Sequence, residues 1–184
     1  MPSLDDLKKR IGSVKSTQKI TKAMKMVAAA KLRRAQESAE SSRPYSDTMN
    51  EVIGSISNKV VSTSSERNLL TGTGDDQVQL LILFTSERGL CGGFNSSITK
   101  MMREKIEDLQ KLNKTVKIIC IGKKGYDILK RKYSDLIVDV IDMKAIKSVS
   151  YQDAKDISQK IIKMYFDNEF DTCSIFYNKF KSVI

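Results

Sequence analysis

The apolar residues near the start of the chain recur at steps of three and four, which is the rhythm of one face of a coiled-coil helix. This apolar seam consists of Leu4, Leu7, Ile11, Val14, Thr17, Ile20, Met24 and Val27. Around Thr17 the steps of three repeat without a step of four, and such a stammer locally overwinds a supercoil. Ser3 and Asp6 have the spacing of a capping box, and neither Gly nor Pro occurs from Ser13 to Arg43. The pattern predicts a helix over 3–43, which at ~1.5 Å per residue is ~60 Å long and needs a partner for its stripe. An amphipathic helix docked on its own domain is the alternative, and the length of the helix argues against it.

Pro44 is expected to kink this helix or to end it. Helical spacing resumes beyond it, at Met49, Val52, Ile53 and Ile56, so we expect one helix that bends or continues to about residue 58. Residues 62–76 are polar and contain glycine, which is typical of a linker. The expected division is a long coiled-coil helix over 1–61 with a possible kink at Pro44, a linker over 62–76 and an α/β domain over 77–184.

From residue 77 onward, short apolar runs alternate with amphipathic segments. Strands are expected at 77–85, 115–121, 136–141 and 172–180, and helices at 95–112, 122–133 and 150–166. Asn95 or Ser96 is expected to cap the first of these helices, and Ser150 the last. The alternation predicts an α/β fold with a mainly parallel, Rossmann-like sheet wound with helices. Because the chain stops at Ile184, in or just after the last strand, we expect this domain to be incomplete at its C-terminus.

The composition excludes several classes of function. The 184 residues include no His, which excludes Ser-His-Asp triads and HExxH metal sites. Three widely spaced cysteines, Cys91, Cys120 and Cys173, indicate neither a disulfide framework nor a zinc site. Cys120 and Cys173 fall on apolar strands and are expected to be small core residues. We expect no catalytic, cofactor-binding or metal-binding residues.

The loop Ser86–Asn95, SERGLCGGFN, follows the first strand, where α/β folds bind phosphates. Its glycines fit neither GxGxxG nor GxxxxGK[ST], and no His is available to activate Cys91. We therefore expect a structural loop made of Gly89, Leu90, Cys91, Gly92, Gly93 and Phe94, with a nucleotide-dependent enzyme as a weaker alternative. Gly122 and Gly125 are likewise expected to serve a turn, and Glu87 and Arg88 could form a surface ion pair.

The positive charge is concentrated at the start of the chain. Of a net +10, residues 1–43 contribute 11 basic and 4 acidic side chains, and the rest contributes 21 basic and 18 acidic. The first segment therefore needs an anionic partner. A basic-helix nucleic-acid-binding protein with an α/β domain is an open alternative. No aromatic residue precedes Tyr45 to stack on bases, and Lys outnumbers Arg in the helix, which weakens that alternative.

Three sequence runs carry a resemblance to a known family. They are KITKAMKMVAAAKLRRAQ at 19–36, preceded by RIGSVKSTQ, then SERGLCGGFN at 86–95, and YNKFKSV at 177–183. In order and spacing they resemble the gamma subunits of F-type ATP synthases, and bacterial members most closely. The resemblance covers the whole chain. The family's C-terminal helix is missing, so the chain is expected to be truncated before it.

The resemblance implies a non-catalytic central-stalk subunit, a rotor shaft that couples rotation of the membrane c-ring to conformational change at the catalytic beta subunits. Its implied partners are the alpha and beta subunits, the epsilon subunit, the c-ring and the missing C-terminal helix of the same subunit, with no nucleic acid and no cofactor. Met24, Lys25, Met26 and Val27 fall where the shaft is expected to meet acidic loops of beta. The implied location is the cytoplasmic side of the bacterial plasma (inner) membrane, as a peripheral protein.

Overall fold

The computed structural model describes residues 3–60, 69–70, 72–146 and 149–182. The chain divides into two compact units, Met1–Asn58 and Lys59–Ile184. The first unit is one helix and the second holds the sheet with its covering helices. Part of the expected linker, residues 62–68 and 71, lies outside the described residues.

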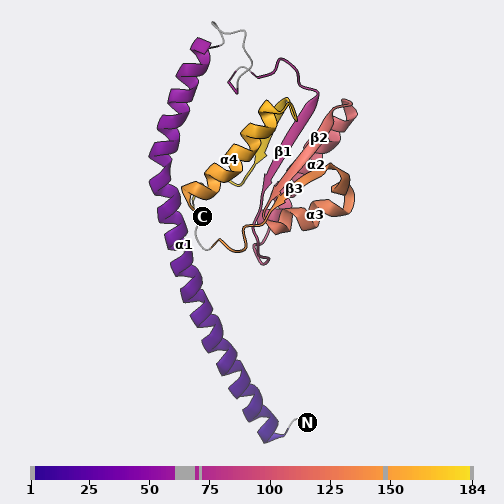
Figure 1. The fold of residues 1–184 in the computed structure, drawn as a ribbon. Helices are drawn as coiled ribbons and strands as arrows, with labels where there is room; N and C mark the ends of the chain where they lie inside the picture. Colours follow the sequence, from indigo (N-terminus) through magenta and orange to yellow (C-terminus); the bar gives the residue numbers. More distant parts are fainter. Residues whose placement is uncertain (1–2, 61–68, 71, 147–148, 183–184) are drawn as a thin grey trace. The chain divides into compact units, whose positions relative to one another are not determined.

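Helix α1 runs from Leu4 to Val60, a continuous helix of 57 residues. The predicted capping box is present: the Asp6 backbone N–H donates to Ser3 Oγ at 3.2 Å, and the Ser3 N–H donates to Asp6 Oδ2 at 3.1 Å. Pro44 lies inside the helix without ending it. Of the two outcomes expected at Pro44, termination is therefore wrong, and Figure 1 shows α1 as one gradually curved helix. A proline removes one backbone hydrogen bond, and a helix of this length tolerates that loss.

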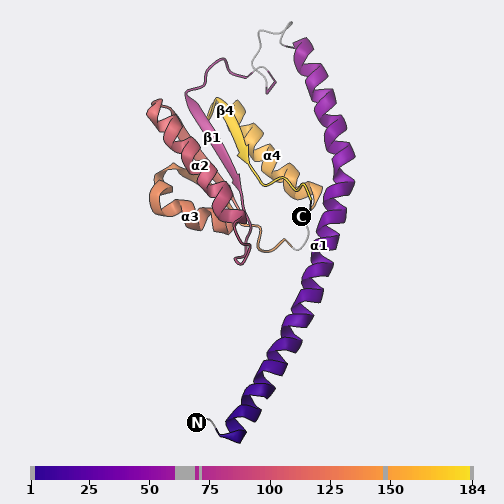
Figure 2. The same cartoon turned by 180° about the vertical axis from the view of Figure 1, so that it is seen from behind.

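Four parallel strands form the sheet of the second unit, in the order β3-β2-β1-β4. They are β1 (Val78–Phe84), β2 (Thr115–Ile121), β3 (Ile137–Ile141) and β4 (Thr172–Phe176). The connections contain α2 (Phe94–Lys111), α3 (Lys123–Tyr133) with the short 3-10 helix η1 (Ser134–Leu136), and α4 (Tyr151–Phe166). Figures 1 and 2 show α2 and α3 together over one face of the sheet, with α4 on the other. The predicted α/β class with a parallel sheet is confirmed.

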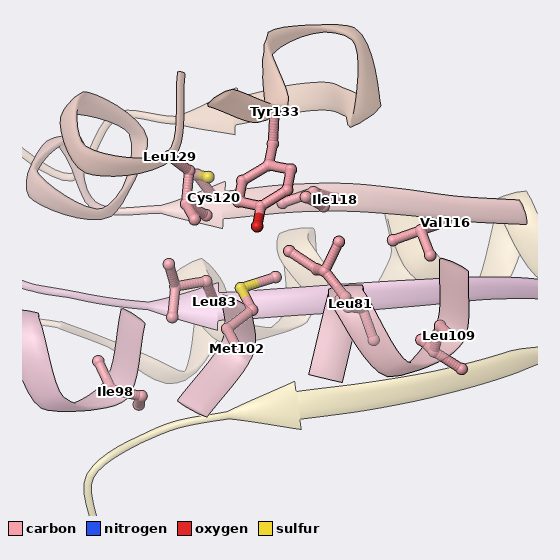
Figure 3. Packing of buried hydrophobic residues seen from close by; sticks show 11 residues of the cluster. Leu81, Leu83, Ile98, Met102, Leu109, Val116, Ile118, Cys120, Leu129 and Tyr133 are labelled. Carbon is pink, nitrogen blue, oxygen red and sulfur yellow. The ribbon is translucent and has the colours of Figure 1, made fainter. Parts of the chain in front are cut away.

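Successive residues of the central strands point into two different cores, as the period of two in a strand requires. Leu81 and Leu83 pack under α2 and α3, whereas Leu80 and Ile82 pack under α4. On the first face, Figure 3 shows Met102 of α2 close to Leu81 and Leu83, and Leu129 and Tyr133 of α3 over β2. Burial on both faces explains why β1 is an almost unbroken apolar run in the sequence.

Two sequence-based expectations for this unit are wrong in detail. Neither Asn95 nor Ser96 caps α2, because its N-cap is Gly93, which has no side chain to do so. The fourth strand ends at Phe176 rather than at residue 180. Its register pairs Phe176 with Leu83, one residue before β1 ends, so β1 offers only Phe84 to the chain beyond. By contrast, the Ser150 cap is confirmed as a capping box with Asp153.

Candidate functional site

The apolar seam of α1 is exposed to solvent over its length. Its seven apolar members, from Leu7 at 44% to Leu4 at 70%, all keep a large fraction of their surface accessible. Exposed aliphatic side chains in a continuous stripe are a recognised mark of an interaction surface. An isolated amphipathic helix also has little stability without a partner for that stripe. The seam is therefore a candidate partner-binding surface.

At the stammer, the polar side chains of the helix bond back to its own backbone. Thr17 Oγ1 donates to the Ser13 carbonyl at 3.0 Å, and Thr21 Oγ1 donates to the carbonyls of Thr17 and Gln18 at 3.0 Å each. Such bonds satisfy the hydroxyls of Thr17 and Thr21 within the helix. The slip in the seam is thus accommodated without a break in α1.

The basic residues of α1 are concentrated in one stretch, residues 7–32, which we call the basic tract. It contains eight basic residues and no acidic one: Lys8, Lys9, Arg10, Lys15, Lys19, Lys22, Lys25 and Lys31. Lys15, Lys19 and Lys22 are neighbours on the helix at spacings of four and three, where like charges destabilise an isolated helix by a few tenths of a kcal/mol per pair. An ion pair of α1 joins Arg33 to Glu37 at 2.8 Å, outside the tract. An anionic partner would relieve this repulsion.

Met24, Lys25, Met26 and Val27 lie within the basic tract, and all four are exposed. Because successive helical residues are about 100° apart, Met24 and Val27 lie on the seam while Lys25 and Met26 lie on its two flanks. One flat partner cannot cover all four. The arrangement allows a helix against the seam and a second surface against the flanks.

The loop that follows β1 is held by side chains of its own two ends. Asn95 Oδ1 accepts from the Ser86 backbone N–H at 3.0 Å, and Asn95 Nδ2 donates to Ser86 Oγ at 2.8 Å. Ser86 Oγ in turn donates to the Arg88 carbonyl at 2.6 Å. This explains why Asn95 is not a helix cap: its amide closes the base of the loop. The sequence did not identify Asn95 in this role, because a cap and a loop brace use the same residue type.

Inside that brace the backbone turns sharply. Leu90 has φ 63° and Gly92 φ 56°, both in the left-handed region. The left-handed conformation is easy for Gly92 and unusual for Leu90, whose side chain is fully exposed at the loop tip. Cys91 Sγ donates to the Arg88 carbonyl at 3.2 Å. Glu87 does not pair with Arg88 as suggested, since its Oε1 accepts from the Met143 backbone N–H at 2.8 Å.

Gly122 and Gly125 allow α3 to approach the end of β1 closely. Gly122 has φ 97°, and a Cβ there would lie 2.9 Å from Thr85 Oγ1. A Cβ on Gly125 would lie 2.8 Å from Leu83 Cδ2. Thr85 Oγ1 accepts from the Gly125 N–H at 2.8 Å and donates to the Gly122 carbonyl at 3.1 Å. These glycines therefore serve a tight strand–helix turn, as expected, and Thr85 is the partner that the sequence did not reveal.

The loop lies at the carboxyl end of β1, beside the point where strand order reverses between β1 and β4. Asn178, just after β4, donates from Nδ2 to the Phe94 carbonyl at 3.2 Å and so joins the two sides of this point. In doubly wound sheets this is the usual place for a ligand. In this protein the side chains of Ser86, Asn95 and Asn178 form hydrogen bonds to backbone groups of the loop.

The three cysteines have different surroundings. Cys120 is fully buried in the core under α2 and α3, and burial raises its pKa to about 12. Cys173 packs against the core under α4, and burial raises its pKa to about 11. Cys120 is a core residue, as predicted, whereas Cys173 is only partly buried. Cys91 is exposed in the loop. In the described part of the chain, no cluster of three potential metal ligands occurs.

None of the helices that the structure describes is both long and apolar enough to cross a membrane.

Comparisons with known proteins agree with one another. A protein-family model described as ATP synthase matches residues 3–184. A protein of Sinorhizobium medicae named ATP synthase gamma chain is 55% identical over all 184 residues, and one of Rhizobium johnstonii with the same name is 56% identical. The chain spans 63% of the length of each of these relatives.

A solved structure gives the same result. The central stalk and c-ring structure of the Tetrahymena thermophila mitochondrial ATP synthase contains a chain with a TM-score of 0.68 and 28% identity. The similarity covers 89% of this chain and 66% of that one. The comparisons therefore favour the central-stalk interpretation over the nucleic-acid-binding alternative.

Proposed function

Because this chain belongs to the ATP synthase gamma-chain family, we propose that it contributes one helix of the rotor shaft and most of the shaft's α/β foot. In this role it couples rotation of a membrane c-ring to conformational change at catalytic beta subunits and performs no chemistry itself. The observation that carries the proposal is α1, a 57-residue helix with an exposed apolar seam and a basic tract free of acidic residues. A long helix that carries two kinds of binding surface suits the transmission of torque.

The seam is the surface for a second shaft helix. We assign to it the C-terminal helix of the gamma subunit, paired antiparallel with α1, from the part of the relatives' length that this chain does not span. Burying seven side chains of the Leu, Ile, Val and Met type would contribute on the order of 10 kcal/mol before the entropy of pairing is subtracted. The stammer near Thr17 would set where the two helices change register.

The flanks of the seam are the surface for the catalytic ring. Lys25 and Met26, which point away from the seam, would meet acidic loops of the beta subunits, while Met24 and Val27 would pack against the second helix. Charge complementarity of this kind sets orientation and partner choice more than bulk affinity. Inside the ring of alpha and beta subunits, these acidic loops would then relieve the repulsion between the basic residues of the tract.

The α/β unit would form the foot, in contact with the epsilon subunit and the c-ring at the cytoplasmic side of a bacterial plasma (inner) membrane. We retain the division into a coiled-coil helix over 1–61, a linker over 62–76 and an α/β domain over 77–184. The loop Gly89–Phe94 would be structural or interfacial, with Leu90 and Phe94 as its exposed apolar contacts. Its internal brace by Ser86 and Asn95 supports that role.

Co-expression with bacterial alpha and beta subunits tests the ring contact. A tagged form of the chain is expected to retain both subunits through affinity and size-exclusion steps. Lys25→Glu should reduce their recovery, because it places a negative charge against acidic loops. Lys105→Glu, which makes the same charge change on an exposed face of α2, should leave recovery unchanged. Equal recovery of alpha and beta with the unmodified chain and both variants would contradict the contact assigned to Lys25. If no form retained the two subunits, the proposal that the chain binds the catalytic ring would be wrong.

A further inference from the structure

A groove formed by α2 and α3 has four basic residues among the eight that line it. It has a volume of about 480 Å³ and is formed by Asn95 and Arg103 of α2 together with Lys124, Asp127, Ile128 and Arg131 of α3. The two helices lie on the same face of the sheet (Figures 1 and 2). The groove thus belongs wholly to the α/β unit and does not involve α1.

The acidic groups near this groove are already neutralised. Asp127 Oδ1 accepts from Lys130 Nζ at 2.8 Å, and Glu107 Oε1 accepts from Lys132 Nζ at 2.8 Å and from the Tyr133 hydroxyl at 3.2 Å. Among the described residues, Arg103, Lys124 and Arg131 have no such acidic partner. The groove therefore carries three cations that make no direct ion pair, although Lys124 lies close enough to Asp127 to help Lys130 lower the pKa of that carboxyl.

Arg103 also has an unsatisfied hydrogen-bond donor. Its Nε is shielded from solvent and has no acceptor within the described structure. A shielded N–H of a charged group is costly to leave unpaired, and such groups usually mark a missing partner. A carboxylate or phosphate oxygen entering the groove would satisfy it with a charge-assisted hydrogen bond.

The spacing of the cations indicates an extended ligand. Lys124 and Arg131 are seven residues apart on α3, so they lie on one face at a separation of ~10 Å. A single small anion cannot bridge that distance, whereas carboxylates distributed along a peptide can. Ile128 lies between them and is half-buried, which offers an apolar contact. The groove's aromatic residue, Tyr133, is only 4% exposed, so it cannot serve as a platform for stacked bases.

We propose that the α2–α3 groove binds an acidic segment of a neighbouring protein, whose carboxylates pair with Arg103, Lys124 and Arg131. This binding does not depend on the shaft role of α1, because all of its contacts lie in the α/β unit. The segment would combine two or more acidic side chains with an aliphatic one that packs on Ile128.

A binding measurement on the full chain tests the proposal. The probe is a fluorescein-labelled poly-Glu peptide, followed by anisotropy at low salt, where charge pairing is strongest. The groove variant changes Arg103, Lys124 and Arg131 together to Gln. The control variant changes Lys105, Lys155 and Lys163 to Gln, which removes the same charge from exposed positions elsewhere on α2 and on α4. In all forms compared, the eight basic residues of the α1 tract are also changed to Gln, so that binding of the peptide to α1 does not mask the groove.

We expect the groove variant to bind the peptide at least about tenfold more weakly and the control by less than about twofold. In the unmodified chain, the amide NMR signals of Ile128 and Arg131 should shift as the peptide is added. Equal losses in both variants, or no loss in the groove variant, would overturn the proposal. A thermal unfolding curve checks the fold, and Lys124→Gln with Arg131→Gln replaces the triple change if that variant unfolds.

Two further probes distinguish the chemistry of the ligand. Inorganic tripolyphosphate and a single-stranded oligothymidine are added in competition with the peptide. Weaker binding of both than of poly-Glu supports an acidic protein segment. Tighter binding of either one, lost in the groove variant, would overturn that assignment in favour of a phosphate ligand.

Discussion

Replacing Gly122 with Ala should destabilise the α/β unit by several kcal/mol. Gly122 has φ 97°, and a Cβ there would lie 2.8 Å from the Thr85 carbonyl carbon, 2.9 Å from Thr85 Oγ1 and closer still to the carbonyl oxygen. These atoms belong largely to the backbone at the end of β1, which cannot move alone. Thr85 N–H donates to the Ile121 carbonyl at 2.8 Å, and Thr85 Oγ1 accepts from Gly125 N–H at 2.8 Å.

The expected magnitude has two parts. A positive φ costs a residue with a Cβ about 1–2 kcal/mol. Moving Thr85 away from the new methyl group weakens two or three hydrogen bonds, at about 1 kcal/mol each. The sum is about 3–5 kcal/mol, at the upper end of the range for single substitutions.

The matched control is Gly74→Ala. Gly74 also has a positive φ, 83°, but a Cβ there meets nothing within 4 Å. It should lose only the conformational part, about 1–2 kcal/mol. The assay is native-state hydrogen exchange of the β1 and β2 amides, which reports unfolding of the sheet without interference from α1. If the two variants differed by less than about 1 kcal/mol, the close approach of Gly122 to Thr85 would be refuted as a source of stability.

Three further predictions follow from the core, the cysteines and the seam. Met102 is fully buried and its neighbour Met101 is 62% exposed. Met102→Ala should therefore lower the free energy of unfolding in urea by about 2–5 kcal/mol, and Met101→Ala by less than about 0.5 kcal/mol. Equal losses would contradict the assignment of Met102 to the buried face of α2. Ellman's reagent at pH 8 should titrate one thiol rapidly, Cys91, and three in guanidinium, because burial raises the pKa of Cys120 to about 12 and of Cys173 to about 11. The unfolded chain releases these two thiol protons near pH 9, whereas the native chain keeps them. The contribution of the two thiols to the free energy of unfolding should therefore be constant below about pH 9 and fall as the pH rises above it. The part of the Sinorhizobium medicae relative beyond the matched 184 residues is added to this chain as a separate polypeptide. The helical circular dichroism of the mixture should exceed the sum of the two parts, and Val14→Asp should abolish that gain. No gain with the unmodified chain would contradict the pairing of the seam with that helix.

Periodicity was sufficient to predict most of the secondary structure. Strand β2 begins and ends where the apolar run 115–121 does, and α4 begins at its Ser150 cap, because both signals are local. The end of β4 was overestimated since a strand ends where its neighbour stops offering hydrogen bonds, which is not encoded in the strand's own residues. The extension of α1 through Pro44 depends likewise on helix-forming residues on both sides rather than on the proline itself.

The candidate surfaces were only partly visible in the sequence. The seam and the basic tract follow from helical spacing and charge, and both lie where they were predicted. The brace by Asn95 and the clamp by Thr85 depend on residues 9 and 40 positions away in sequence. The cationic groove depends on α2 and α3 lying side by side, and on Asp127 and Glu107 being used by other lysines. Such pairings arise from packing and cannot be predicted from charge counts.

A chimaeric gamma subunit provides the most direct measurement of the proposed shaft role. Residues 1–184 of this chain would be joined to the remainder of the Sinorhizobium medicae gamma chain and expressed in a strain that lacks its own gamma gene. ATP synthesis driven by a proton gradient is then measured in membrane vesicles, with and without a protonophore. We expect synthesis well above the gamma-deficient background and its loss with the protonophore. A chimaera that assembles with alpha and beta subunits and the c-ring yet gives only background synthesis would contradict the shaft role of α1 and the foot.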